Sequence, residues 1–149
     1  MRRDEDSDGS GLTLRLAPEA EPPLVQVRRW ASQALADLGE DHLVATLLVV
    51  TELVTNAYQH GQGATRIRVW REPEPCRIRI EVDDRSSTPP EVRTPDARTP
   101  GGRGLQMVGK ASLDWGTRVT HGGKTVWAVI DCSAFGWQPC PRPQPQRED

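Results

Sequence analysis

Two polar side chains that interrupt an apolar segment are the best candidates for chemistry in this sequence. Glu52 and Asn56 lie within 42–59, where apolar residues recur at helical spacing. At about 100° per residue they share one helix face, within about 40° of each other. A carboxylate can act as a general base, and a carboxamide oxygen is a ligand for a hard cation. Such a pair also occurs on ordinary solvated helix faces, but valines and leucines surround this one, so it borders buried surface.

A second candidate lies at the end of an apolar strand predicted over 76–82. Asp84 and Ser86 follow that strand, and a carboxylate there can accept the exocyclic amine of an adenine. The same residues would suit an ordinary strand-ending turn. Because Val82 points inward and residues two apart share a strand face, Asp84 rather than Asp83 is expected to point inward.

Glycines at the start of a short helix, predicted over 104–113, are a third candidate. Backbone N–H groups there can close around phosphate oxygens, and the helix dipole favours anions. The pattern is not a P-loop, and a short Gly-x-Gly is weak evidence by itself. It does end a long polar segment, 85–103, as a lid over a nucleotide would. Further on, Thr125 could place a hydroxyl beside the base. The four residues of the lid candidate are Gly102, Arg103, Gly104 and Leu105.

The segments that must position these residues follow a definite order. Alternating patterns predict strands and helical spacing predicts helices. The result is an α/β (α+β) two-layer sandwich, a mostly antiparallel mixed sheet with three helices on one face. The predicted elements are a strand at 12–16, helices at 24–38 and 42–59, strands at 66–70 and 76–82, a helix at 104–113, and strands at 118–120 and 125–130.

The charged positions of the central strands allow two interpretations. Arg66, Arg68, Arg77 and Arg79 alternate with apolar residues. They could form a binding patch, but the open face of the sheet is the favoured interpretation. We expect one domain over 11–135, with a disordered N-terminal tail over 1–10 and a proline-rich, disordered C-terminal tail over 136–149.

Composition excludes several classes of protein. The 149 residues carry a formal net charge of −2, without the basic excess typical of nucleic-acid binders. No apolar stretch is long enough to span a bilayer, and the N-terminus does not read as a secretory signal. We therefore expect a cytoplasmic protein that binds neither nucleic acid nor membrane.

The cysteines and histidines give no metal pattern in the sequence. Cys76, Cys132 and Cys140 are widely spaced, without a CxxC pair or a zinc spacing. His42 and His121 give no metal constellation with His60, which is expected to be structural. The spacing therefore predicts reduced thiols in a cytosolic protein.

The order of the candidate motifs resembles that of the GHKL superfamily of ATP-binding domains. The segment ELVTNAYQHG, from Glu52, resembles its N-box, and VDDRS, from Val82, resembles its G1 box. GRGL, from Gly102, resembles the G2 box, and GKT, from Gly123, the last motif. Over about 12–131 the chain resembles the anti-sigma-factor serine/threonine kinases, in particular the stand-alone, histidine-kinase-like regulatory ATPases abundant in actinobacteria.

This resemblance implies a Bergerat ATP-binding fold and a role for each candidate residue. Asn56 would ligate Mg²⁺ and Glu52 would be the general base. Asp84 would bind the adenine amine with support from Thr125, and Ser86 stands where many relatives have glycine. Gly102, Arg103, Gly104 and Leu105 would bind the phosphates of ATP.

The implied activity is that of an anti-sigma factor that is also a serine protein kinase. It would phosphorylate a STAS-type anti-anti-sigma factor with Mg-ATP and bind a sigma factor, and the resemblance also suggests a homodimer. The alternative is a non-catalytic, nucleotide-gated switch that holds a partner without phosphorylating it. The catalytic half of a histidine kinase is a third, less favoured interpretation.

Overall fold

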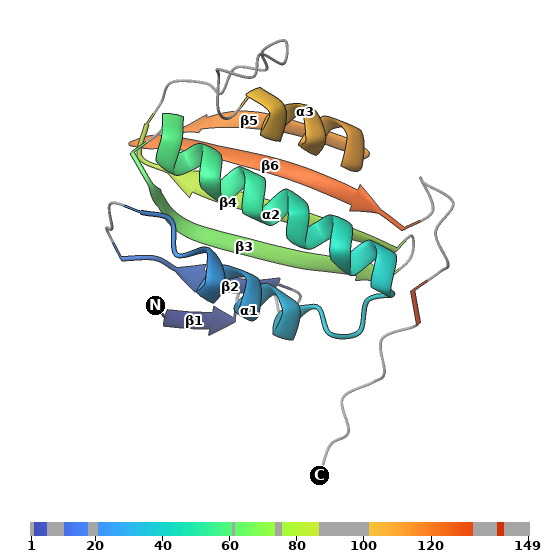
Figure 1. Cartoon of the computed structure of the whole chain (residues 1–149). Coiled ribbons are helices and arrows are strands. Elements are labelled where there is room, and N and C mark those ends of the chain that lie inside the picture. Colours follow the sequence, from blue (N-terminus) through green and yellow to red (C-terminus); the bar gives the residue numbers. More distant parts are fainter. Residues whose placement is uncertain are drawn as a thin grey trace.

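The computed structural model describes residues 2–5, 11–17, 21–60, 62–73, 76–86, 102–132 and 140–141. From β2 onward the helices and strands follow one another in the order that the sequence patterns predict (Figure 1). The elements are β1 (Arg2–Glu5), β2 (Gly11–Arg15), α1 (Leu24–Ala34), α2 (Glu40–His60), β3 (Ala64–Pro73), β4 (Cys76–Asp84), α3 (Gly102–Ala111), β5 (Asp114–Thr120) and β6 (Gly123–Asp131).

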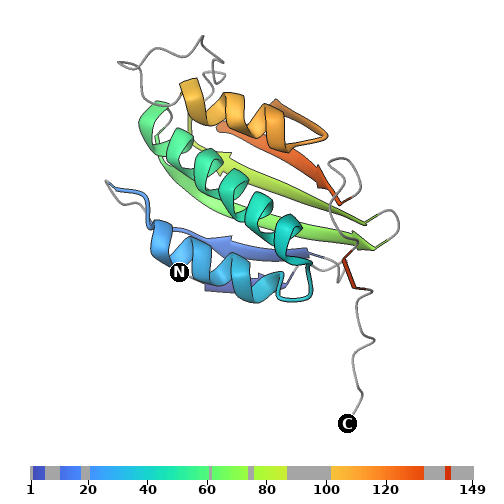
Figure 2. The ribbon, with the colours of Figure 1, turned by 45° about the vertical axis from the view of Figure 1, so that its right-hand side comes forward.

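The strands form one antiparallel sheet in the order β1-β2-β3-β4-β6-β5. All three helices cover the same face of this sheet, and the other face is open (Figures 1 and 2). The predicted two-layer α+β sandwich is therefore confirmed. Among the described helices, none has the length and apolar content of a membrane span.

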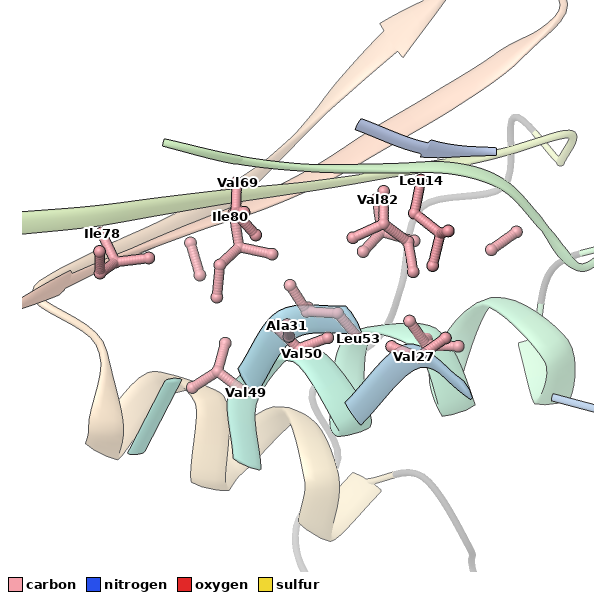
Figure 3. Close-up of a cluster of buried hydrophobic side chains, with 14 of the residues drawn as sticks. Leu14, Val27, Ala31, Val49, Val50, Leu53, Val69, Ile78, Ile80 and Val82 are labelled. Atoms are coloured by element: carbon pink, nitrogen blue, oxygen red, sulfur yellow. The ribbon is translucent and has the colours of Figure 1, made fainter. Parts of the chain in front are cut away.

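The core lies between the helix layer and the sheet. The apolar stripe of α2 packs on the inward residues of the central strands (Figure 3). Val49, Leu53, Ile80 and Val82 are each at most 1% exposed, and burying such a side chain contributes about 1.5–3 kcal/mol. The apolar residues at helical spacing on α2 and at alternating positions on β4 therefore pack in one layer. This packing fixes the rotation of α2 on the sheet.

The open face of the sheet holds the arginines in ion pairs. Arg66 pairs with Asp83, and Arg68 and Arg79 both pair with Glu81. Two of these guanidinium groups also lie over tryptophan rings, at 5.1 and 4.9 Å from the ring centroids. These contacts agree with the interpretation of the arginines as the open sheet face.

Several boundaries differ from the predicted ones. The predicted helix over 104–113 begins two residues earlier, and β5 begins at Asp114 rather than at 118. Leu113 is drawn toward the sheet because its N–H donates to the Val129 carbonyl at 2.7 Å. At the N-terminus, residues 2–5 pair with β2 as an edge strand, where the sequence predicted a disordered tail.

The predicted C-terminal tail, 136–149, also contributes to the domain. Cys140 is half-buried and packs against the core, and the Pro141 carbonyl accepts a hydrogen bond of 2.7 Å from Arg71. The other residues of that tail lie outside the described residues, as does most of the predicted lid, 87–101.

Candidate functional site

The last two turns of α2 place a buried amide beside the sheet. Asn56 is 3% exposed, and its Oδ1 atom has no hydrogen-bond partner among the described residues. Glu52, one turn earlier on the same helix face, is half-buried. An unpaired buried carbonyl oxygen costs about 1–3 kcal/mol. A hydrogen-bond donor or a cation that binds at the Asn56 oxygen would offset this cost.

Three other elements end or begin near this turn of α2. The end of β4, the start of α3 and the start of β6 lie at the same end of the sandwich as the C-terminus of α2 (Figure 1). Gly63 closes the helix: its φ of 86° is the left-handed conformation that glycine tolerates, and its N–H donates to the Ala57 carbonyl at 3.0 Å. The polar end of α2 therefore lies at the end of the sandwich where β4 ends and where α3 and β6 begin.

The glycine-rich candidate segment forms the first turn of α3. Gly102, Arg103, Gly104 and Leu105 belong to this helix, which packs against α2. The first N–H groups of a helix lack intrahelical partners and attract anions. The structure thus brings the predicted phosphate-binding backbone to the helix that carries Glu52 and Asn56.

Asp84 points inward, as strand parity predicts, but it is not a free carboxylate. Its Oδ2 accepts a hydrogen bond of 2.6 Å from the Lys124 ammonium, and both side chains are 1% exposed. Its Oδ1 accepts the N–H of Ser86, whose carbonyl oxygen in turn lies 3.2 Å from the Lys124 Nζ. A carboxylate offers about four lone-pair positions, so roughly two remain for a further donor.

Thr125 lies on the other face of the sheet and is not brought together with Asp84. Its hydroxyl donates to Asp83 Oδ1 at 2.6 Å, and Arg66 Nε donates to Asp83 Oδ2 at 2.7 Å. The reason is the register of β6, in which Lys124 rather than Thr125 shares the inward face with Val126. The same alternation that selects Asp84 in β4 would have selected Lys124 in β6.

A hollow of about 390 Å³ opens on the side of the sheet away from the helices. Its lining includes Asp83 and Thr125 together with basic side chains from neighbouring strands, among them Arg66, Arg68 and Arg118. Asp84 also lines this hollow, whereas Glu52 and Asn56 do not.

Gly123 sets the close approach of β6 to the end of β4. A Cβ atom at this position would lie 2.0 Å from the Asp84 carbonyl oxygen, a backbone atom that cannot rotate away. Gly123→Ala is therefore expected to lower the free energy of unfolding by at least about 1–3 kcal/mol, measured by urea denaturation. Gly109→Ala is the matched control, since its nearest contact is 3.3 Å from the Trp115 ring and alanine favours a helix. Equal stability of the two variants would contradict this packing.

Comparison with known protein families identifies the domain. The model of the histidine kinase-like ATPase domain matches residues 16–130, from the end of β2 to the last strand. The chain belongs to this family. A search of curated proteins found no match to the sequence. An ATPase domain binds ATP.

The residues of this ATPase domain fit the groups that a nucleotide brings. The unpartnered Asn56 Oδ1 is a hard oxygen of the kind that Mg²⁺ takes. The first turn of α3 suits the phosphates, and Asp84 retains acceptor capacity for an amine. Lys124 is the residue of the site that the sequence patterns missed.

Proposed function

We propose that this ATPase domain is a regulatory serine protein kinase, an anti-sigma factor that phosphorylates an anti-anti-sigma factor with Mg-ATP. The observation that carries the proposal is the buried, unpartnered Asn56 oxygen one helical turn from the Glu52 carboxylate. A domain that only binds ATP needs the first residue but has no use for a base beside it. The motif order Glu52, Asn56, Asp84 and Gly102–Leu105 supports the same assignment.

Each residue has a role that its position allows. The Asn56 amide oxygen holds the cation, which when bound neutralises charge on the phosphates. The Glu52 carboxylate, half-buried and one turn away, orients the serine hydroxyl of the substrate and accepts its proton. The serine oxygen then bonds to the γ-phosphorus, and ADP leaves. Phosphoryl transfer relies mainly on positioning and electrostatics, so this short set of residues is chemically sufficient.

The adenine end of the site is built from Asp84 and its ion pair. The carboxylate accepts the exocyclic amine of the base with the lone pairs that Lys124 and Ser86 leave. Lys124 holds the carboxylate in one orientation through the 2.6 Å contact. A guanine presents a carbonyl at the corresponding position and would face the carboxylate acceptor to acceptor, so this arrangement selects ATP over GTP.

Glu52→Gln tests the kinase assignment. We expect transfer of labelled γ-phosphate to a STAS-type partner to fall by at least about 100-fold, because a positioned general base contributes roughly 10²–10⁴-fold. The affinity for ATP should be unchanged. Glu40→Gln is the matched control, since Glu40 is an exposed carboxylate in the first turn of the same helix.

The same experiment separates a second candidate, a nucleotide-gated switch that sequesters a sigma factor or another regulator without phosphorylating anything. The buried Asp84–Lys124 pair favours it. An adenine that must compete with the Lys124 ammonium for the Asp84 carboxylate binds weakly, and weak, reversible binding suits a switch. If the wild-type chain binds ATP but forms phosphoserine on none of the STAS-type partners offered, the kinase proposal is wrong. Retention of partner regulation by Glu52→Gln would then identify the switch.

A further inference from the structure

At the end of the sandwich opposite Asn56, four side chains from separate elements converge. His42 lies in the first turn of α2, Cys76 begins β4, Cys132 follows β6, and Cys140 belongs to the segment after it (Figure 1). One ligand atom from each lies within 4.8 Å of every other, the imidazole and three thiols forming a single cluster. His42 and Cys132 are buried, and the other two are half-buried.

The spacing of these atoms is that of a tetrahedral metal site. His42 Nδ1 lies 3.1 Å from Cys140 Sγ and 3.8 Å from Cys76 Sγ, and Cys132 Sγ lies 3.5 Å from Cys140 Sγ. Zinc–sulfur bonds of about 2.3 Å and zinc–nitrogen bonds of about 2.0 Å require tetrahedral ligand atoms roughly 3.5–3.8 Å apart. The other pairs of ligand atoms lie within 4.8 Å of each other, so side-chain shifts of up to about 1 Å would bring the cluster to that geometry.

Neighbouring backbone groups make hydrogen bonds that orient the side chains of the cluster, as such bonds do around the ligands of a metal site. His42 Nε2 lies 2.8 Å from the Ile130 carbonyl, so the ring donates its proton there and turns the Nδ1 lone pair toward the thiols. Backbone N–H groups of Gly39 and Cys140 donate to Cys140 Sγ and Cys132 Sγ, each at 3.3 Å. Such donors stabilise thiolates bound to a metal.

We propose that His42, Cys76, Cys132 and Cys140 form a structural zinc site. Thiolates and an imidazole are the ligands that zinc prefers, and four protein ligands leave no open position for catalysis. The site fastens the segment after β6 to the beginnings of α2 and β4. On binding Zn²⁺ the three thiols lose their protons to solvent, which gives the ligand set a charge of −3 and the site a net charge of −1. The Arg71 guanidinium, with Nη2 at 3.9 Å from Cys76 Sγ, partly balances this charge.

The convergence of these side chains was not predicted from the sequence, in which the cysteines show no CxxC pair and no zinc spacing. His42 and Cys76 are separated by 34 residues, and Cys132 and Cys140 by 8. Zinc motifs are recognised by short, paired spacings, whereas here the sheet register and the start of α2 bring the ligands together. The cluster is about 14 helical rises, or roughly 21 Å, from Asn56 along α2, so it is independent of the nucleotide site.

Elemental analysis and cobalt substitution test the proposal on the full chain. Protein purified under reducing conditions without chelators is expected to carry about one zinc per chain. After removal of zinc, Co²⁺ alone should produce thiolate charge-transfer bands and the intense visible bands of a tetrahedral site. Cys140→Ser and Cys76→Ser should weaken Co²⁺ binding by at least about 100-fold, since even outer-shell changes cost 10–100-fold. His121→Gln, an exposed histidine outside the cluster, should change nothing.

Three results would overturn the zinc site. The first is a reduced wild-type chain that holds no zinc and gives no cobalt charge-transfer bands. The second is a Cys140→Ser variant that keeps the wild-type cobalt spectrum. Cys140 lies outside the helices and strands, so this variant is expected to fold, which far-ultraviolet circular dichroism verifies. The third is a Cys132–Cys140 disulfide that is present after reduction and Co²⁺ addition, with no Co²⁺ bound.

Discussion

Replacing Lys124 with methionine is expected to lower the free energy of unfolding by about 3–5 kcal/mol. Lys124 and Asp84 are each 1% exposed, and their contact of 2.6 Å is the closest pairing that the Asp84 carboxylate makes with a cation. Lys124→Met leaves the carboxylate charged and buried without its partner, which is costlier than never having buried the pair. Chemical denaturation monitored by tryptophan fluorescence measures the loss.

Two comparisons make this result specific. Lys110→Met, in the exposed last turn of α3, should cost no more than about 1 kcal/mol, the size of a helix-dipole contact. The double variant Asp84→Asn with Lys124→Met should recover much of the lost stability, because removing both charges is often neutral. If Lys124→Met were as stable as Lys110→Met, the buried ion pair would not exist as described.

Replacing Asn56 with alanine is expected to weaken Mg-ATP binding by roughly 10–150-fold. The amide oxygen has no partner among the described residues, so in the free chain the variant loses no hydrogen bond made by Oδ1. With the nucleotide bound it loses a contact to a charged group, which is worth about 1.5–3 kcal/mol, and each 1.4 kcal/mol is tenfold in affinity. Calorimetric titration with ATP, with and without Mg²⁺, measures the change.

The Mg²⁺ dependence distinguishes this role from a structural one. In Asn56→Ala the affinity measured with Mg²⁺ should fall to the value measured without it. Gln59→Ala, an exposed position in the same turn of α2, should bind as the wild type does. An Asn56→Ala variant with undiminished Mg-ATP affinity would remove Asn56 from the site.

Local periodicity was sufficient to predict most of the fold. The helical stripe of α2 and the alternation of β4 correspond to buried residues such as Leu53 and Ile80, because each pattern reports which face meets the core. The inward orientation of Asp84 followed from parity with Val82 in the same way. The start of β5 was not predicted correctly. Only Ser112 and Leu113 separate this strand from α3, so the helical and strand patterns overlap there.

The unpredicted side-chain contacts depend on how segments distant in the sequence pack together. Lys124 meets Asp84 because β4 and β6 pair these two residues directly, and no local pattern specifies that pairing. Thr125 was expected beside Asp84 from its place in a motif, whereas the pairing sends its hydroxyl to Asp83. His42 and Cys132 approach each other because the start of α2 lies beside the end of β6, and no local pattern specifies that contact.

Calorimetry of the wild-type chain with ATP and with GTP, each with Mg²⁺, tests the central claim most directly. We expect a single ATP site per chain, dependent on Mg²⁺, with GTP bound roughly 5–150-fold more weakly, since an unpaired buried acceptor costs about 1–3 kcal/mol. Competition between the two nucleotides should show that they share the site. No heat of binding with Mg-ATP, or equal affinity for ATP and GTP, would contradict a nucleotide site built on Asn56 and Asp84.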